Sequence, residues 1–290
     1  MTLIKSISGV RGTIDNKDQG LSDHEVLKCV KQFASFLIEG QPKKNTIVVG
    51  RDGRSSGLRI IKLVTSTLIK MGIHVLNLDL TTTPSVQLAI IHEYCLAGIM
   101  ISASHNPINW NGLKFLNSKG EFLSKKEGDK VFNYSSDISK HSNSYGLIKN
   151  MNYLYKHVDL ILQLSDVQLD QIKLSNFKIV VDGINSSGGI YVPYLLRKMG
   201  IDVIELNCIA NGDFAHNPEP VPENLEDLCE KVIAYKADLG IAVDPDVDRL
   251  VLVCNDGSFF GEEYTIVAVV KYILSKHPRV KVSYLCATKS

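Results

Sequence analysis

Short apolar runs alternate with helix-like patterns along the first part of the chain. Residues 46–50 form an apolar run typical of a buried strand, and the apolar positions of residues 58–71 recur at helical spacing. Gly72 follows that helix, where a glycine commonly ends a helix by taking a left-handed conformation. Residues 74–78 predict the next strand. Strand, helix and strand in this order predict a βαβ unit and therefore a parallel sheet.

The same order of patterns occurs twice. Residues 48–57 read VVGRDGRSSG and are followed by a helical pattern and KMGIHV. Residues 179–188 read IVVDGINSSG and are followed by a shorter helical pattern and KMGIDV. The shared strand, Asp-Gly turn, Ser-Ser-Gly segment and helix predict two related α/β domains rather than a short-period solenoid. Chance similarity between two βαβ units is the alternative.

Polar and amphipathic stretches divide the chain into three parts. Residues 133–150 are polar and predict a loop or edge structure at the end of the first domain. We expect a first α/β domain, a second one and the incomplete start of a third, at residues 1–150, 151–255 and 256–290. The fold class is therefore α/β, with repeated βαβ domains, mixed but mainly parallel sheets, and helices on both faces.

Four further elements follow from the later patterns. An amphipathic pattern predicts one helix at residues 158–174 that connects the first two domains. The apolar run at residues 239–243 predicts the last strand of the second domain. In the third part, residues 264–274 predict a helix and residues 281–286 a strand.

Composition narrows the class of protein. The 290 residues include 32 Lys and Arg against 31 Asp and Glu, a net charge of +1, so no basic surface for nucleic acid or anionic membrane is expected. The N-terminus lacks the apolar core of a signal peptide, and no apolar run approaches the roughly 20 residues of a membrane span. Six scattered cysteines without a C-x-x-C pair argue against a disulfide framework and a zinc site. We expect a reduced, cytoplasmic protein.

An acidic loop, Asp244-Pro-Asp-Val-Asp-Arg249, follows the strand predicted at residues 239–243. On an extended backbone, which Pro245 favours at the preceding residue, its alternate side chains would share one face. Three carboxylates held so close repel each other unless a cation lies between them, and hard oxygen ligands indicate Mg²⁺ or Ca²⁺. An EF-hand is excluded, because Arg249 and Asn255 stand where that loop needs Gly and Glu. A solvated acidic turn is the alternative. The candidate ligands are Asp244, Asp246 and Asp248.

A second loop, Ser102-Ala-Ser-His-Asn-Pro107, follows the apolar run at residues 96–101. Magnesium usually meets phosphate in enzymes, and a phosphoryl group on Ser104 would supply the missing anionic ligand. Spacing alone does not choose between the two serines. Ser104 lies nearer the turn at the Asn-Pro pair, where a dianion has room, whereas Ser102 adjoins the buried run, where an uncompensated dianion is costly. We therefore expect the phosphate on Ser104.

Basic residues occur in several loops that also contain glycine. Arginine and lysine side chains suit phosphate oxygens. Each one alone is more simply a surface cation or part of a capping turn, and a loop histidine such as His105 is weak evidence by itself. Their occurrence together favours an anion site. The candidates are Arg11 in Ser8-Gly-Val-Arg-Gly12, Arg51 and Arg54 in Arg51-Asp-Gly-Arg-Ser55, Lys114 behind Asn111-Gly112, and Arg249.

These segments together resemble the α-D-phosphohexomutases, over the whole chain and in the same order. The serine loop, followed by Asn111-Gly-Leu-Lys114, looks like the active-site serine motif of that family, and residues 244–249 look like its magnesium loop. Ser8-Gly-Val-Arg-Gly12, Val49-Gly-Arg-Asp-Gly-Arg54 and Asn217-Pro-Glu-Pro220 are similar to further family segments. The serine motif leans towards phosphoglucosamine mutases, with phosphomannomutase or phosphoglucomutase as the alternative.

The resemblance implies an enzyme that moves a phosphoryl group between C6 and C1 of a hexose phosphate through a hexose bisphosphate. Ser104 would be the phosphorylated residue, and a phosphoserine oxygen would bind Mg²⁺ together with Asp244, Asp246 and Asp248. Around the transferring group would lie Arg11, Lys114 and Arg249, with His105 beside it. The expected partners are the two sugar phosphates and a homodimer, with neither nucleic acid nor membrane.

Two alternatives differ in mechanism. An aspartyl-phosphate phosphotransferase of the haloacid-dehalogenase kind could use Asp246-Val-Asp248, but its Asp pair normally follows the first strand of a domain, and the serine loop would have no role. A non-catalytic fragment that binds a metal or a phosphosugar is the other. The resembling family has four domains, of which the third supplies a sugar-recognition loop and the fourth a phosphate clamp. We expect this chain to contain neither, which leaves the sugar undetermined.

Overall fold

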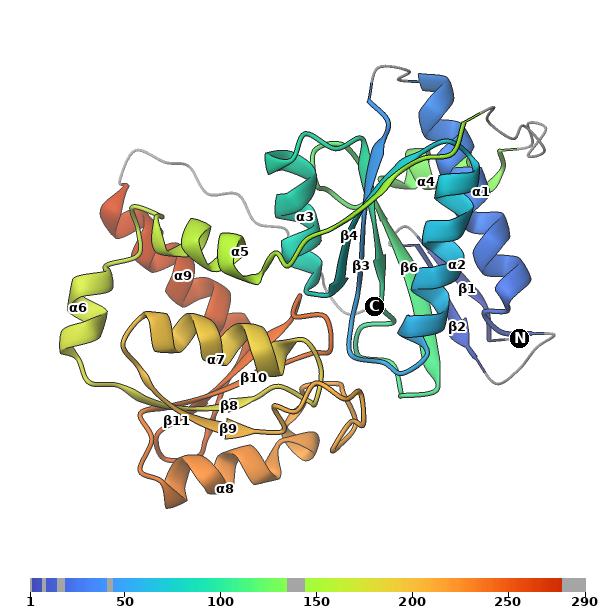
Figure 1. The fold of residues 1–290 in the computed structure, drawn as a ribbon. Helices are drawn as coiled ribbons and strands as arrows, with labels where there is room; N and C mark the ends of the chain where they lie inside the picture. The colour runs from blue at the N-terminus through green and yellow to red at the C-terminus, as the bar shows by residue number, and fades with distance from the viewer. Residues whose placement is uncertain (1, 7–8, 15–18, 41–43, 135–143, 278–290) are drawn as a thin grey trace.

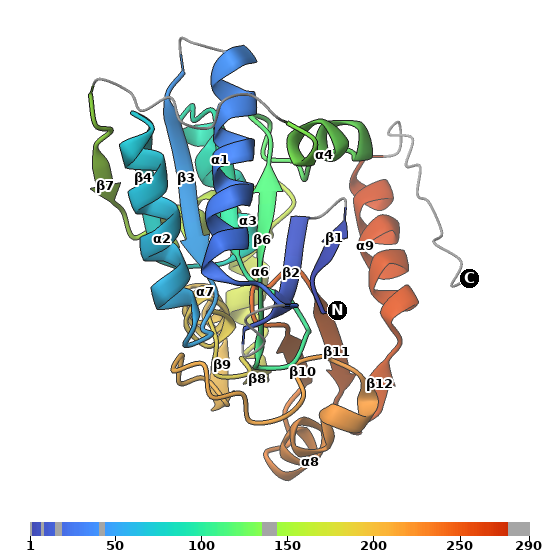
Figure 2. The same cartoon turned by 90° about the vertical axis from the view of Figure 1, so that its right-hand side faces the viewer.

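The computed structural model of the chain describes residues 2–6, 9–14, 19–40, 44–134 and 144–277. They form two sheets, each covered by helices, and the smaller sheet lies beneath the larger one in both views (Figure 1, Figure 2). The α/β class, the mixed sheets and the helices on both faces are confirmed. The strand predicted at 281–286 lies outside the described residues. The domain boundaries at residues 150 and 255 stay predictions.

The larger sheet has seven strands in the order β1-β2-β6-β5-β3-β4-β7. Strands β5, β3, β4 and β7 pair parallel to one another. Strand β6 pairs antiparallel with β5, and β2 and β1 continue the sheet beyond β6 in antiparallel pairs. The short edge strand β7 confirms the edge expected at the end of the first domain. The strands are β1 (Ile4–Ser6), β2 (Gly9–Thr13), β3 (Thr46–Arg51), β4 (His74–Leu80), β5 (Ala97–Ile101), β6 (Trp110–Leu116) and β7 (Ile148–Asn150).

Alternate residues of β3 face two separate cores, which explains its unbroken apolar run. Ile47 and Val49 pack with apolar residues of α1 and α2 on one face of the sheet, and Val48 packs with residues of α3 on the other. A parallel strand buried on both faces carries no polar alternation. The helices of this part are α1 (Asp23–Gly40), α2 (Gly57–Lys70), α3 (Thr83–His92) and α4 (Lys125–Phe132).

The smaller sheet has five strands in the order β12-β11-β10-β8-β9. Its β8 pairs parallel with β9 and with β10, and the last strands are antiparallel. The expectation that residues 239–243 form the last strand of the sheet was wrong, because the acidic loop is a hairpin that returns the chain into β11. The strands are β8 (Lys178–Asp182), β9 (Asp202–Leu206), β10 (Leu239–Val243), β11 (Leu250–Cys254) and β12 (Phe259–Phe260).

The two predicted βαβ units are confirmed, and their helices end alike. Helix α2 joins the parallel strands β3 and β4, and the shorter α7 (Gly188–Lys198) joins β8 and β9. Gly72 and Gly200 follow these helices with φ of 79° and 80°, a left-handed conformation that glycine adopts at little cost. Helix α8 (Glu226–Ala234) covers the opposite face of the smaller sheet from α7, and a short 3-10 helix, η1 (Pro222–Asn224), precedes α8.

The single connecting helix predicted at residues 158–174 was wrong. Two helices, α5 (Leu154–Leu162) and α6 (Leu169–Leu174), occupy this stretch. The chain turns between them because Asp166 is bound to α9 (Glu262–Lys276): its carbonyl accepts from the Tyr272 hydroxyl, and its carboxylate pairs with His277 just beyond that helix. Helix α9 confirms the helix expected at 264–274.

Two expectations from the sequence concern the cysteines and membrane-spanning helices. The five cysteines among them are free thiols. No helix within the described ranges combines the length and the apolarity that a membrane span requires.

Candidate active site

The serine loop leaves the carboxyl end of β5 and returns through β6. Ser104 has φ of 51°, a conformation that is uncommon for residues other than glycine and that marks a constrained position. Its backbone N–H donates to Ser102 Oγ at 2.9 Å, and the Ser102 hydroxyl donates to Asp52 Oδ2 at 2.8 Å. Ser102 is therefore occupied in holding the loop, whereas Ser104 directs its hydroxyl away from the first sheet.

Arg54, which we expected to bind an anion, is instead part of the framework of the serine loop. Its side chain is fully buried. The guanidinium donates to Asp52 and to four backbone carbonyls, with donor–acceptor distances of 2.6–3.1 Å. These carbonyls belong to Ser104, Asn106, Pro107 and Trp110. Arg51 is also committed elsewhere, since its Nε pairs with Asp79 at 2.6 Å.

The acidic loop gathers its three carboxylates by a tight turn. The extended backbone that we expected was wrong: Val247 has φ of 60°, and the N–H groups of Asp248 and Arg249 both donate to Asp244 Oδ1. The three carboxylates nevertheless lie close together, as we expected. Oxygens of Asp244, Asp246 and Asp248 lie within 4.8 Å of one another. The Asp244 carboxylate, which accepts from two backbone N–H groups, thus organises the loop, and the carboxylates of Asp246 and Asp248 lie next to it.

Lys114 extends from β6 to this acidic cluster. Its Nζ lies 2.6 Å from Asp246 Oδ2 and 2.5 Å from Asp248 Oδ2. Burial alone would raise the pKa of Asp246, but the Lys114 ammonium and hydrogen bonds from Lys114 and Thr83 outweigh it and hold this pKa below its ordinary value. Asp246 is therefore a carboxylate at neutral pH, although its side chain is buried.

Asp244 connects the acidic loop to the serine loop. The Ser104 hydroxyl donates to Asp244 Oδ2 at 2.6 Å, although the two residues are 140 positions apart. Burial raises the pKa of Asp244, and the neighbouring carboxylates of Asp246 and Asp248 raise it further. A cation beside Ser104 would offset this repulsion and favour the ionised form.

Three buried polar atoms at the site have no hydrogen-bond partner among the residues that the structure describes. They are Asp246 Oδ1, Arg11 Nε and His105 Nδ1. Buried polar atoms are normally paired, so three unpaired atoms around one cavity are consistent with a bound ligand. A carboxylate oxygen among three carboxylates fits a hard divalent cation, and a guanidinium N–H fits a phosphate oxygen. The residues present therefore suit a metal ion and an adjacent phosphoryl group.

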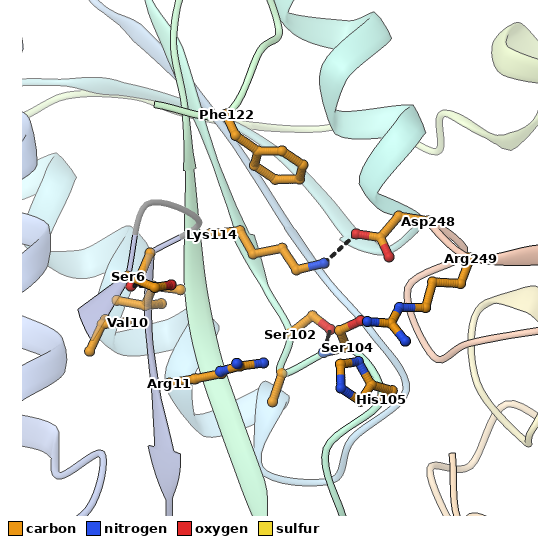
Figure 3. A pocket seen from close by; sticks show the side chains of 13 residues that line it. Ser6, Val10, Arg11, Ser102, Ser104, His105, Lys114, Phe122, Asp248 and Arg249 are labelled. Atoms are coloured by element: carbon orange, nitrogen blue, oxygen red, sulfur yellow. Dashed lines mark hydrogen bonds and ion pairs between the residues drawn. The ribbon is translucent and has the colours of Figure 1, made fainter. Parts of the chain in front are cut away.

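A cavity of about 490 Å³ brings the predicted residues together. Figure 3 shows Arg11 and Lys114 reaching in from the first sheet and Asp248 and Arg249 from the acidic loop, with Ser104 between them. His105 lines the same cavity; burial lowers its pKa, and the nearby Arg249 lowers it further, so the imidazole is neutral at pH 7. Arg11 also donates to Asn106 Oδ1 at 3.0 Å. Asp244 and Asp246 are buried behind this lining and are hydrogen-bonded to Ser104 and Lys114, whereas Arg51 and Arg54 do not line the cavity. The candidate residues that line it are Arg11, Ser104, His105, Lys114, Asp248 and Arg249.

Sequence reasoning missed Thr83 and the role of Asp52. Thr83, the first residue of α3, donates its hydroxyl to Asp246 Oδ2 and its N–H to the Asp246 carbonyl. The Thr-Thr-Thr-Pro run at residues 81–84 is a helix-start signal that could have placed a helix N-terminus here. Asp52 lies in the repeated Asp-Gly turn and accepts from the Ser102 hydroxyl, a contact that no local pattern predicts.

Comparison with known proteins agrees with this geometry. Residues 3–142 match the family described as phosphoglucomutase/phosphomannomutase, alpha/beta/alpha domain I, and residues 155–257 match its domain II. A phosphoglucomutase/phosphomannomutase of Thermococcus kodakarensis is 34% identical over 93% of this chain, and a probable phosphoglucosamine mutase of Methanopyrus kandleri is 34% identical over 95%. In each case the chain spans 59% of the relative's length.

A solved structure shares the fold. The putative phosphomannomutase of Thermus thermophilus superposes with a TM-score of 0.82 at 21% identity, over 95% of this chain and 63% of that one. At this identity the match supports the architecture alone.

Proposed function

The chain belongs to the phosphoglucomutase/phosphomannomutase family of α-D-phosphohexomutases, and on that premise we propose that the protein is a phosphohexomutase. It would move a phosphoryl group between C6 and C1 of a hexose phosphate by way of a phosphorylated Ser104. One observation carries the proposal: the Ser104 hydroxyl lies 2.6 Å from Asp244 Oδ2, inside a cluster of three carboxylates and beside a cavity lined by cations. A non-nucleophilic structural serine would need no such surroundings.

In the proposed reaction, a sugar hydroxyl oxygen attacks the phosphorus atom carried by Ser104. The new P–O bond forms as the bond from phosphorus to Ser104 Oγ breaks, and the hydroxyl proton passes to a base at the site. Ser104 Oγ then attacks the other phosphate of the resulting hexose bisphosphate and regains a phosphoryl group. The bond from that phosphorus to its sugar oxygen breaks as the new bond forms, and the proton held by the base passes to this sugar oxygen. Phosphoryl transfer of this kind depends mainly on positioning and on charge stabilisation.

The basic side chains would supply that stabilisation. Arg11 and Arg249 reach the cavity from opposite sides, and Lys114 lies between them. Charges placed in advance around the transferring group stabilise the transition state without reorganisation. His105, neutral and with an unpaired Nδ1, lies where it can bind a phosphoryl or hydroxyl oxygen.

We propose Mg²⁺ as the metal, held by Asp244, Asp246, Asp248 and an oxygen of phosphorylated Ser104. The hard carboxylate donors and the orphan Asp246 Oδ1 support a small divalent cation. When bound, such a cation draws electron density from phosphoryl oxygens and neutralises the repulsion among the three carboxylates.

The substrate is proposed from the relatives and from the serine motif. Phosphoglucosamine mutase is the activity we favour, because the second relative carries that name and the serine motif leans the same way. Phosphomannomutase or phosphoglucomutase activity is the alternative that the name of the first relative supports. A homodimer and a cytoplasmic location stay predictions.

The test of this function is the position and chemistry of the phosphate. Protein treated with glucose 1,6-bisphosphate should gain one phosphate by intact mass spectrometry, and peptide mapping should place it on Ser104. Ser104→Ala should gain none, whereas the matched control Ser102→Ala should still gain it. The linkage should resist hydroxylamine, which cleaves the acyl phosphate of an aspartyl-phosphate mechanism. Phosphate on Ser102 or on an aspartate, or label retained in Ser104→Ala, would refute the proposed function.

A further inference from the structure

The two repeated Asp-Gly turns, far apart in the sequence, contact each other between the sheets. The Gly53 N–H of the first turn donates to Ser186 Oγ of the second at 2.8 Å. The turns are so close that a Cβ atom at Gly53 would lie 2.8 Å from Ser186 Cα. The loop after β9 also approaches the first turn, since a Cβ at Gly212 would lie 2.0 Å from the Gly53 carbonyl oxygen. Gly53 therefore has no room for a side chain, which indicates a built contact.

The first turn holds the serine loop. Asp52 accepts from the Ser102 hydroxyl, and Arg54 donates to the carbonyls of Ser104 and Asn106. Ser56, the second serine of the Ser-Ser-Gly segment, accepts from Asn111 Nδ2 at 2.8 Å, on the strand that leaves the loop. Each of these three side chains of the turn therefore contacts the loop that carries Ser104, or the strand that follows it.

The second turn holds the acidic loop in the same way. The hydroxyls of Ser186 and Ser187 both donate to the Pro245 carbonyl, at 2.6 Å and 2.7 Å, and both side chains are fully buried. Pro245 lies between Asp244 and Asp246 in the sequence. The turn itself is strained, because Ile184 and Asn185 have φ of 47° and 51°. Strain of this kind persists where the surroundings over-determine the backbone, and it is common at functional sites.

We propose that Ser186 is a positioning residue that sets the distance between Ser104 and the acidic cluster. It is the point at which the two turns meet: it accepts from Gly53, next to Arg54 of the serine loop framework, and it donates to Pro245 of the acidic loop. Ser187 donates to the same carbonyl but makes no hydrogen bond to Gly53 within the described part of the chain. Thr83, Lys114 and Ser104 also bond the acidic loop to the first α/β unit, so losing Ser186 loosens the arrangement without releasing it.

Ser186 would thereby control how strongly a phosphate on Ser104 and a bound metal ion favour each other, a role that rests on the proposed function. A misplacement of about 1 Å between reacting groups can cost on the order of 100-fold in rate. If Ser186 fixes the spacing, a phosphate on Ser104 and a cation among the carboxylates should favour each other strongly only while Ser186 is present. Coupling between two ligands of this kind typically corresponds to about 5–150-fold in affinity.

The experiment measures that coupling with MgCl₂ as the only added ligand. Phosphoserine is encoded genetically at position 104 of the full chain, so the measurement does not depend on the protein phosphorylating itself. Mg²⁺ affinity is determined by calorimetry for phosphorylated and unmodified protein, in the wild type, in Ser186→Ala and in the matched control Ser187→Ala. Both variants remove one donor to Pro245, but only Ser186→Ala removes the acceptor for Gly53.

We expect phosphorylation to increase the Mg²⁺ affinity of the wild type at least about fivefold. This ratio should fall to roughly one half or less of its wild-type value in Ser186→Ala and stay near the wild-type value in Ser187→Ala. Ser186→Cys keeps a side chain of similar size and a weak acceptor, so it should show an intermediate ratio and replaces Ser186→Ala if that variant does not fold.

The outcomes separate the two proposals. A wild-type ratio near one would count against the phosphoserine–metal site and thus against the proposed function. A high wild-type ratio that is unchanged in Ser186→Ala and Ser186→Cys would overturn the positioning role alone. An equal fall in both alanine variants would also overturn it, because the loss would then follow the Pro245 contact rather than the link between the turns.

Discussion

At the scale of single residues, the hydrogen-bond partners decide whether a buried cation belongs to the site or to the framework. Lys114 lines the cavity and contacts Asp246 and Asp248, whereas Arg54, which we expected to bind an anion, donates to carbonyl groups of the serine loop. A guanidinium has five N–H donors in a rigid plane and can satisfy several carbonyls at once. This geometry, rather than the charge, explains an arginine at position 54.

The framework role of Arg54 leads to a prediction about stability. Arg54→Lys keeps the charge but leaves carbonyls of the serine loop without donors, so we expect it to lower the free energy of unfolding by about 2–4 kcal/mol. Urea denaturation at neutral pH measures this difference. The control is Arg59→Lys, at an exposed position paired with Asp23, where a change of well under 1 kcal/mol is expected. Similar losses in both variants would contradict the framework role.

Lys114 supports a prediction about the metal. Burial would lower its pKa, but Asp246 and Asp248 outweigh that effect and hold the pKa above the ordinary value, so the side chain is charged. Lys114→Met leaves the acidic cluster without this cation, and we expect metal-free protein to lose roughly 3 kcal/mol. Added MgCl₂ should then raise the melting temperature more in Lys114→Met than in the wild type.

A thermal shift series with and without MgCl₂ checks this prediction for Lys114. Lys119→Met is the control, because that lysine is exposed on the turn after the same strand. A smaller rise in melting temperature with MgCl₂ in Lys114→Met than in the wild type would contradict the prediction. It would show that Lys114 promotes metal binding rather than taking the place of the metal's charge.

At the scale of elements, both reactive loops begin at the carboxyl ends of strands that pair parallel to a neighbour. The serine loop follows β5, and the acidic loop follows β10. In open α/β sheets, ligands bind at this edge. Helix α3 adds its first turn, where Thr83 contacts Asp246, and the positive end of a helix favours a carboxylate. The two sheets thus present equivalent edges to one another, and the site lies between them.

Helix α5 supports a prediction about acid stability. His157 lies between α3 and α7: its Nδ1 is 2.7 Å from Ser85 Oγ, and its ring lies 6.1 Å from that of Tyr191. Burial lowers its pKa to about 4, below the 6.5 of an exposed imidazole. The unfolded chain therefore binds a proton more readily than the folded one, and stability falls as the pH decreases from about 6.5 towards 4.

We expect His157 to contribute on the order of 1–2 kcal/mol to this acid sensitivity, less than the full shift implies because the side chain is partly exposed. Urea denaturation at several pH values between 7.5 and 4.5 measures it. His157→Gln should lose less stability over this range than the wild type, and the exposed-site control His24→Gln should behave as the wild type. Parallel pH curves for His157→Gln and the wild type would contradict the prediction.

At the scale of the whole molecule, the residues proposed to carry the phosphate and to hold the metal lie in this chain, which spans 59% of the length of the relatives it matches. In the family that it resembles, further domains supply a sugar-recognition loop and a phosphate clamp. We expect residues 1–290 alone to accept a phosphoryl group on Ser104 and to turn over glucosamine 6-phosphate poorly, because the substrate cannot be held in line.

A coupled mutase assay beside the phosphorylation assay tests this separation. The expected result is stoichiometric labelling of Ser104 with turnover far below the roughly 10 per second of a typical enzyme. The Ser104→Ala variant is the control for background activity. Turnover on the order of 1 per second or more by these 290 residues alone would contradict the prediction.

Local patterns determined much of this protein. The apolar runs of β3, β4 and β10 and the helical spacing of α2 predicted these elements, because a strand buried between two layers is apolar throughout and a helix with one buried face repeats its apolar positions about every 3.6 residues. The repeated turn predicted two related units, and the two loop motifs together with the segments of Arg11 and Lys114 contained candidate residues that the cavity brings together. Spacing also indicated a cluster of carboxylates, although the backbone reaches it by a turn rather than by an extended segment.

Only the tertiary structure decided how these parts meet. Two features depend on contacts between distant residues: that Lys114 rather than Arg54 faces the cavity, and that the chain breaks between α5 and α6. The contact from Ser104 to Asp244 joins positions 140 apart, and that from Gly53 to Ser186 joins positions 133 apart. No periodic pattern records such a pair, because the energy that fixes it comes from the packing of one folded unit against another.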